Sequence, residues 1–386
     1  MDAGRRRRAK REIVHLCHSG LDAETLLGEA MRQVDQVVPY DRICWHTVDP
    51  TTLLFTSATQ RNLGPEPRLA TYEYEIPDVN KWAELARRPW PVGVLSQATH
   101  GHPERSPRYR ALLAPRGVGH ELRASLVSDH RCWGYVGFYR DRGRTDFCEE
   151  DAAFVAEVDE PIGAGVRRAL LLDAVTGPGP VDDVPGVVIL DSASQLSAMN
   201  AAAEELIALL PDDRHPPAQP LPQTVLAVAA QARRAAADPN CASARCRAHT
   251  VTGQWVVLHG TRLGEGPEAS TAVIIERARP AELAELIVIA YGFTPREREV
   301  TRLVVLGRST HEIAQSLHLS PLTVQDYLKT IFEKVGVHSR RELVGTVFRD
   351  HYWHRALAGD PIGAEGFFIT DDLTSTAAAT QGPTTE

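Results

Sequence analysis

Long apolar runs are missing from this 386-residue sequence. No stretch approaches the ~18 consecutive apolar residues that a membrane-spanning helix needs, and the arginine-rich start is not followed by the apolar segment of a secretory signal. Cysteine is scarce too, because six cysteines without dense, even spacing do not make a disulfide framework. We therefore expect a cytoplasmic protein without a membrane partner.

Motifs for catalysis and cofactor binding are missing as well. The sequence contains no glycine-rich phosphate loop, no nucleophile elbow and no zinc motif. His15, Cys17 and His18 come nearest to a metal site, but offsets of two and three residues do not put all three on one helical face. We expect no enzyme activity, no cofactor and no metal.

The composition is that of a soluble globular protein, with 43% hydrophobic and 24% charged residues. The length allows about two to four domains, and stretches rich in proline, glycine or small polar residues mark their boundaries. We predict an α+β multidomain chain with five segments: a basic N-terminal arm and lead-in (1–19), two strand-containing domains (20–172 and 183–278), an all-α unit (280–350) and a disordered tail (358–386).

Apolar periodicity in the first of these domains predicts an antiparallel sheet flanked by helices. The turn pair Asp49-Pro50 separates two of its strands, and the polar stretch 128–131 separates two others. The predicted strands are 42–48, 53–57, 121–127 and 132–139, and the predicted helices are 22–37, 80–87, 105–113 and 149–171.

The second domain begins with a strand, a turn containing Asp191 and another strand, after which Asn200 opens a helix. A proline-rich stretch and an alanine-rich helix follow, and two alternating segments close the domain. The predicted strands are 186–191, 195–199, 254–259 and 272–276, and the predicted helices are 201–210 and 224–237.

Four helix-capping signals lie in register between residues 294 and 348. Thr294 with Glu297, Ser309 with Glu312, and Ser339 with Glu342 form capping boxes, in which a hydroxyl and a carboxylate satisfy free backbone N–H groups. Ser320 caps the remaining helix ahead of a proline. Helices this short make little core, so we expect the bundle to present one of them to a partner.

The third helix is the one that the pattern presents. Val324, Leu328 and Ile331 recur at three- and four-residue steps and form an inward stripe, and a three-residue turn, 318–320, joins the third helix to the shorter second one. A helix, a tight turn and a helix with a polar outer face place a recognition helix in the DNA major groove. The outer face carries Leu322, Gln325, Asp326, Lys329 and Glu333.

The segment resembles the LuxR-type (NarL/FixJ-type) helix-turn-helix domain, through the run 294–300, Gly307, 312–314, 319–321, 323–324, Lys334, 339–340 and 342–344. The resemblance implies that Thr323 and Lys329 contact phosphates or base edges and that Gln325 and Asp326 face the groove. Asp326 departs from the basic residue or Asn that many relatives carry, and it suits DNA only as an acceptor for a cytosine amino group. The DNA-binding residues that we expect are Ser320, Thr323, Gln325, Asp326, Lys329, Lys334 and Arg340.

Charge favours a dimer on double-stranded DNA. The segment 294–348 has eight basic and six acidic side chains, whereas the whole chain has a formal net charge of −8. Because phosphate neutralisation supplies much of the affinity for DNA, we expect a homodimer on two half-sites about one helical turn apart.

The order of elements in residues 20–172 resembles a GAF-type sensor domain, and the beginning and end of residues 183–278 resemble a PAS domain. The proline-rich and alanine-rich middle of the second domain departs from the PAS pattern. We expect Trp82, Trp90, Trp133 and Tyr135 to be core and nearby arginines such as Arg123 to be solvated, although together they could also line a pocket for a planar or anionic metabolite.

These observations predict a one-component transcription regulator, with contact to RNA polymerase and a small-molecule ligand as further partners. The helix 281–290 would transmit a change in domain orientation, and the basic arm could follow DNA phosphates or be a solvated terminus. Two alternatives stay open. One is a sigma-factor-like promoter-recognition protein, which needs a helical polymerase-binding domain upstream, and the other is an enzyme carried by residues 20–170.

Overall fold

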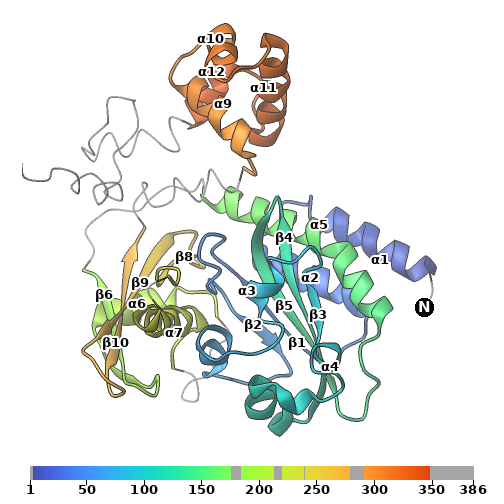
Figure 1. The fold of residues 1–386 in the computed structure, drawn as a ribbon, viewed down its shortest axis with the longest axis vertical. Coiled ribbons are helices and arrows are strands. Elements are labelled where there is room, and N and C mark those ends of the chain that lie inside the picture. Colours follow the sequence, from blue (N-terminus) through green and yellow to red (C-terminus); the bar gives the residue numbers. More distant parts are fainter. Residues whose placement is uncertain (1–2, 175–183, 213–219, 239, 279–290, 348–386) are drawn as a thin grey trace, which may run out of the picture. The chain divides into compact units, whose positions relative to one another are not determined.

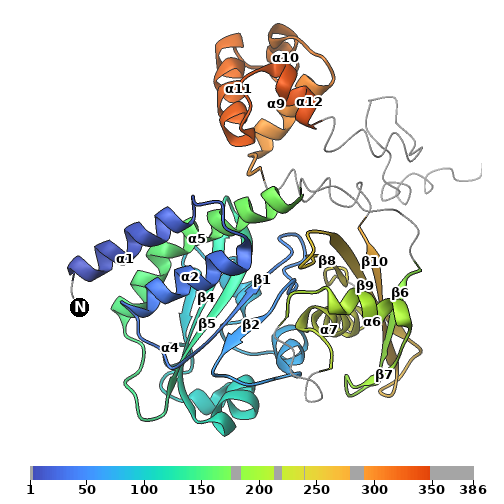
Figure 2. The ribbon, with the colours of Figure 1, turned by 180° about the vertical axis from the view of Figure 1, so that it is seen from behind.

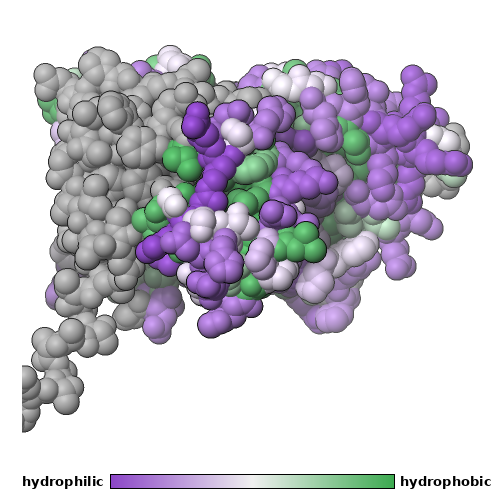
Figure 3. All heavy atoms as spheres, turned by 90° about the horizontal axis from the view of Figure 1, so that it is seen from above, coloured by the Kyte–Doolittle hydropathy of each residue, from purple (hydrophilic) through white to green (hydrophobic). Residues whose placement is uncertain are grey.

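The computed structural model describes residues 3–174, 184–212, 220–238, 240–278 and 291–347. The chain forms two compact units, an N-terminal unit (Met1–Ala290) and a C-terminal unit (Tyr291–Glu386). Within the described ranges, no helix is both long and apolar enough to cross a bilayer. Seen from above, the described residues expose mostly hydrophilic side chains, and hydrophobic ones form small separate patches (Figure 3).

The first sheet of the N-terminal unit is antiparallel and has the strand order β2-β1-β5-β4-β3. Three helices, α1, α2 and α5, cover one face (Figures 1 and 2), and short helical turns cover the other. The strands are β1 (Arg42–Thr47), β2 (Thr59–Arg61), β3 (Val92–Val94), β4 (Val118–Ser128) and β5 (Arg131–Asp141). The helices are α1 (Ala3–Leu16), α2 (Ala23–Asp35), α3 (Trp82–Leu85), α4 (Leu95–Ala98) and α5 (Glu149–Ala174), with short turns η1 (Thr71–Glu75), η2 (Pro103–Arg105), η3 (Tyr109–Leu113) and η4 (Ala114–Arg116).

The hairpin between β4 and β5 is present as predicted. Asp129 and His130 have φ values of 49° and 61°, the left-handed conformation that a two-residue hairpin turn needs. The predicted strand at 53–57 is wrong, because Leu53 has a φ of 63° and only an isolated bridge joins Phe55 to Val48. The strand that pairs with β1 on the side away from β5 is β2, and the segment expected as a basic arm contains helix α1.

The second sheet of the N-terminal unit is also antiparallel, with the order β7-β6-β10-β9-β8. Asn200 caps helix α6 as predicted, because its side chain accepts from the backbone N–H of Ala203 at 3.0 Å. Strand β8 was missed, since it carries two arginines and lacks an apolar run. The elements are β6 (Gly186–Leu190), β7 (Leu196–Met199), α6 (Ala201–Ala208), α7 (Gln223–Ala237), β8 (Arg245–His249), β9 (Trp255–Leu263) and β10 (Ser270–Arg277).

A buried ion pair joins the two sheets. Arg247 on β8 donates through Nε and Nη2 to the two carboxylate oxygens of Asp49, at 2.9 and 3.0 Å, and both side chains are buried. Arg233 on α7 makes a second bidentate pair with Glu75 of η1, at 2.8 and 3.0 Å. Apolar residues of both sheets belong to one core cluster, so the two sheets form a single body.

The C-terminal unit is all-α (Figure 1). Its helices are α9 (Pro295–Val305), α10 (Thr310–Ser316), α11 (Pro321–Val335) and α12 (Arg340–Val347). The predicted transmitting helix 281–290 and the tail 358–386 lie outside the described residues. The core of the unit consists of Phe293, Val300, Leu303, Val304, Ile313, Ala314, Val324, Leu328, Ile331 and Leu343.

Candidate functional site

Local hydrogen bonds begin each helix of the C-terminal unit. At α9, the backbone N–H of Glu297 donates to the Thr294 hydroxyl at 3.2 Å and the Thr294 N–H donates to the Glu297 carboxylate at 2.6 Å. Ser309 and Glu312 make the same reciprocal pair at α10. The bond from the Ser309 N–H holds the pKa of the Glu312 carboxyl below its usual value.

The turn between α10 and α11 is tight and well defined. His318 adopts a φ of 53°, and the N–H of Leu319 donates to the carbonyl of Ala314 at 2.8 Å. The Ser320 hydroxyl then accepts the N–H of Thr323 at 3.0 Å and opens α11. Pro321 suits the first helical position, because it has no N–H to satisfy there and its φ is already that of a helix.

The outer face of α11 is exposed over three turns. Gln325, Asp326 and Lys329 are all exposed, while Val324 and Leu328, their neighbours, are buried. Leu322 is 69% exposed at the start of the same face. An apolar side chain in that position can contact a thymine methyl group. In the sequence, Leu322 stands out because the other residues of this face are polar.

Two of the expected contact residues, Lys334 and Arg340, make bonds inside the unit. The ammonium of Lys334 donates to the Glu297 carboxylate at 2.7 Å and to the Gly292 carbonyl at 2.8 Å, so it ties the end of α11 to the start of α9. The guanidinium of Arg340 donates to the Arg308 carbonyl, which joins α12 to the turn after α9. Both side chains are partly exposed, so their charges remain at the surface of the unit.

A shallow groove runs beside α11. Its lining combines polar residues of α11 with residues of the segments on either side. Hydrogen-bond donors and acceptors both lie along the groove, which suits a hydrated polar partner. The polar lining residues are Thr310, Gln325, Lys329, Glu333, His338 and Arg340.

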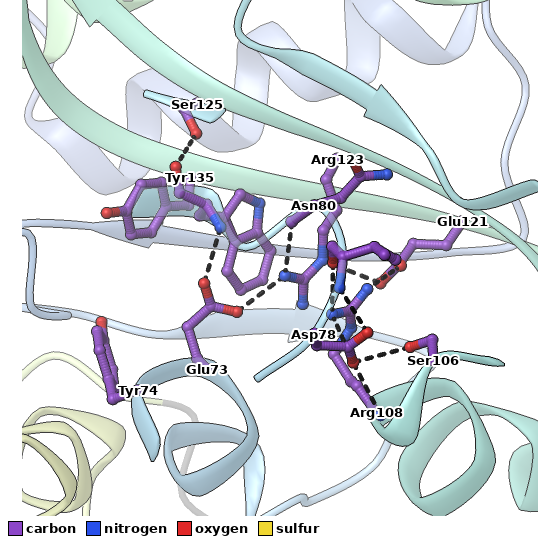
Figure 4. A network of polar contacts seen from close by, with 12 residues as sticks. Glu73, Tyr74, Asp78, Asn80, Ser106, Arg108, Glu121, Arg123, Ser125 and Tyr135 are labelled. Carbon is purple, nitrogen blue, oxygen red and sulfur yellow. Dashed lines mark hydrogen bonds and ion pairs between the residues drawn. The ribbon is translucent and has the colours of Figure 1, made fainter. Parts of the chain in front are cut away.

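The N-terminal unit holds its polar cluster inside (Figure 4). Arg123 on β4 is fully buried and donates to Glu73 at 2.8 Å and to Glu121 at 3.0 Å. Its guanidinium lies 3.7 Å from the centroid of the Trp82 ring. Arg108, which is also buried, donates to the second oxygen of Glu121 at 2.5 Å. The expectation that Arg123 is solvated is therefore wrong.

The neighbouring arginines keep Glu121 charged. Burial alone would raise the pKa of this carboxyl, but the positive charges and hydrogen bonds of Arg108 and Arg123 bring its pKa below the usual value. Asp78 completes the cluster, because its carboxylate accepts from Arg108 at 3.2 Å and from the Ser106 hydroxyl at 2.8 Å. Three carboxylates therefore face two guanidinium groups.

A cavity of about 60 Å³ lies against this cluster. Burial lowers the pKa of His46, one of its lining residues, to about 3, so the imidazole is neutral. Its Nδ1 donates to the Ser57 carbonyl at 3.3 Å, which leaves Nε2 as an acceptor. In the part of the chain that the structure describes, four residues of the lining have a buried polar atom without a hydrogen-bond partner: His46 Nε2, Arg108 Nε, Arg123 Nη2 and Gln223 Oε1.

The sequence carried only an ambiguous signal for this cluster. Glu121, Arg123 and Ser125 alternate with Leu122 and Ala124 along β4, a pattern that ordinarily indicates one buried and one solvated face. Here both faces are covered, so all five side chains are buried. The prediction of buried aromatics holds for Trp82, Trp133 and Tyr135, whereas Trp90 is 51% exposed.

Comparison with known proteins places the C-terminal unit. Residues 292–347 match the family described as bacterial regulatory proteins, luxR family. The spore germination protein GerE of Bacillus subtilis is 39% identical over 56 residues, which is 14% of this chain and 76% of that protein. A putative HTH-type transcriptional regulator of Mycobacterium bovis is 43% identical over 75 residues, but this is 19% of the present chain and only 8% of that protein.

Solved structures align with more of the chain at lower similarity. The alignment with Escherichia coli SdiA covers 89% of this chain and 96% of the SdiA chain, with 13% identity and a TM-score of 0.31. The bacteriophytochrome RpBphP3 of R. palustris covers 75% of this chain and 74% of its own, with 12% identity and a TM-score of 0.35. Scores this low assign no fold to the N-terminal unit.

Proposed function

Because this chain belongs to the luxR family of bacterial regulatory proteins, we propose that it is a one-component regulator that binds promoter DNA as a homodimer. The observation that carries the proposal is the helix-turn-helix, with α11 fixed at its start and its polar face exposed. Two antiparallel sheets upstream argue against the sigma-factor-like alternative. RNA polymerase is a further partner that an activator of this kind would contact.

Direct contacts to DNA come from the exposed face of α11. Lys329 supplies a cation, while Gln325 can make a bidentate contact to adenine and Asp326 can accept from a cytosine amino group. Thr323 and Ser320 lie at the helix start, where hydroxyls and backbone N–H groups can bind phosphate. Lys334 and Arg340 act on the shape of the unit, as their internal bonds indicate.

The experiment is capture of genomic DNA fragments by the purified full-length protein, followed by sequencing. We expect enrichment of a sequence with two half-sites, and loss of that enrichment in Lys329→Ala. A matched control is Arg298→Ala, which removes an exposed cation from α9. Equal capture of all fragments by wild type and both variants would contradict sequence-specific binding.

For the N-terminal unit we propose a sensory role, with GAF-like and PAS-like domains at 20–172 and 183–278. The support is the order of strands and helices, together with the cavity beside the buried cluster. The two unpartnered N–H groups, on Arg108 and Arg123, and the two acceptors, on His46 and Gln223, would bind a group that both accepts and donates. An anion is disfavoured, because the cluster already has one more carboxylate than guanidinium.

The ligand would therefore be a small neutral molecule with a carbonyl or hydroxyl group. The cavity is small, about 60 Å³, so it would take the polar end of such a molecule, with Leu112 and Leu113 beside the apolar part. Native mass spectrometry of the purified protein tests this role. We expect a bound neutral mass that is absent from Leu112→Trp; no bound mass in either protein would indicate water alone.

A further inference from the structure

Helix α1 is anchored to the N-terminal unit along one side. Ala9 and Ile13 are buried against α2 and α5. Beside them, Arg6 donates to Glu157 of α5 at 2.7 Å, and Lys10 lies 3.6 Å from the same carboxylate. These contacts account for one apolar stripe and two of the six basic residues of the helix.

The other side of α1 displays the remaining cations. Arg5, Arg7, Arg8 and Arg11 are exposed, and none of them makes an ion pair within the described residues. At 100° per residue, the last three lie on the side opposite Ala9 and Ile13. Glu12 is the single acidic residue of the helix. An otherwise acidic chain thus carries one uncompensated cationic face.

This face opposes the stability of its own helix. Like charges at i,i+3 and i,i+4, such as Arg8 with Arg11 and Arg7 with Arg11, repel each other. Cations are also unfavourable at the N-terminal end of a helix, where the dipole is positive. A negatively charged partner would relieve both effects, so the arrangement favours such a partner.

We propose that Arg7, Arg8 and Arg11 bind the phosphate backbone of the DNA that the C-terminal unit recognises. The inference rests on the proposed DNA binding. Guanidinium groups match phosphate oxygens with paired hydrogen bonds, and DNA is a polyanion that the acidic remainder of the chain would otherwise repel. The segment 294–348 has only two more basic than acidic side chains, so a second cationic surface adds to affinity without reading sequence.

An anionic membrane fits this helix less well. Helices that lie on a membrane insert large apolar side chains, but the apolar stripe of α1 is buried inside the protein. Val14, at 36% exposure, is the most exposed large hydrophobic residue of the helix.

The test is the salt dependence of DNA binding by the full-length protein. We compare wild type with the triple variant Arg7→Gln/Arg8→Gln/Arg11→Gln on a captured fragment with long flanks, by fluorescence anisotropy. The slope of log Kd against log salt should fall by about 0.9 for each phosphate that the variant no longer neutralises. Preference for the captured sequence over a scrambled one should not change, because phosphate contacts carry no sequence information.

A matched control separates local contact from net charge. The triple variant Arg87→Gln/Arg88→Gln/Arg142→Gln removes three other exposed arginines of the N-terminal unit, and should keep the wild-type slope. Equal slopes for the two triple variants would overturn the inference. Loss of binding to phosphatidylserine vesicles by the α1 variant, with its DNA slope unchanged, would overturn it in favour of a membrane.

The outcome also distinguishes this inference from the proposed function. If wild type captures no DNA at all, the assignment of the helix-turn-helix fails and takes the inference with it. If wild type captures DNA but the α1 variant retains the full salt slope, only the role of α1 fails. Circular dichroism should show both triple variants folded, because every substituted side chain is exposed.

Discussion

Charged side chains are used in opposite ways in the two units of this protein. On α11 of the C-terminal unit, Asp326 and Lys329 face solvent with no ion pair in the described residues. On β4 of the N-terminal unit, Glu121 and Arg123 are buried and bonded to each other. The exposed side chains remain hydrated, so they carry little desolvation cost and can bind a partner. The buried set costs desolvation, so its members are tied to the fold and to each other.

The largest expected effect comes from opening the buried cluster. Arg123→Met leaves Glu73 without its guanidinium and Glu121 with one partner instead of two, so we expect a loss of about 3–5 kcal/mol in unfolding free energy. Urea unfolding followed by tryptophan fluorescence measures it, because Trp45, Trp82 and Trp133 all lie in this unit.

The control for that measurement is Arg88→Met. Arg88 is exposed and makes no ion pair within the described residues, so its loss should change stability by less than about 0.5 kcal/mol. Similar losses in the two variants would mean that burial does not separate the two kinds of charge.

On the exposed face, substitution should affect binding and spare stability. Lys329→Ala should weaken binding to the captured DNA by about 1–3 kcal/mol, roughly tenfold or more. The melting temperature should stay at the wild-type value, because the side chain is exposed. Anisotropy titration and calorimetry check the two parts. A clear drop in melting temperature would show that Lys329 supports the fold.

Lys334 lies on the same helix as Lys329, but its ammonium forms hydrogen bonds within the unit. It therefore tests whether internal bonding separates stability from DNA binding. Lys334→Ala leaves the Glu297 carboxylate, 4% exposed, without its ammonium partner. We expect a loss of about 1–3 kcal/mol in the stability of the C-terminal unit. At a temperature where the variant is folded, its preference among DNA sequences should be unchanged. A changed preference would return Lys334 to the set of DNA contacts.

Stability should also depend on pH through one buried carboxyl group. Burial raises the pKa of Asp159 on α5 from 3.8 to about 8. The folded protein then binds a proton that the unfolded chain releases between these two values, so stability falls as pH rises through that window, by roughly 1 kcal/mol per pH unit. Asp159→Asn should remove this slope and be the more stable protein at pH 8. If wild type and Asp159→Asn gave parallel profiles of melting temperature against pH, the raised pKa of Asp159 would be contradicted.

The same contrast explains what could be predicted from the sequence. The capping boxes at Thr294 and Ser309 rest on residues three apart, so the C-terminal helices were readable before the structure. The partners of Arg123 lie at Glu121 and at Glu73, 50 residues away, and only tertiary packing brings the second one there. The left-handed turn at Leu53 likewise had no local signature, and the predicted strand there was wrong.

Specificity on DNA is the most direct test of the account. The measurement is the affinity of full-length wild type for a captured two-half-site duplex and for a scrambled duplex of equal composition, at one salt concentration. We predict binding to the captured site about 10³-fold tighter or more, as sequence-specific regulators show. Equal affinities for the two duplexes would contradict it, since α11 would then present its exposed face to something other than DNA bases.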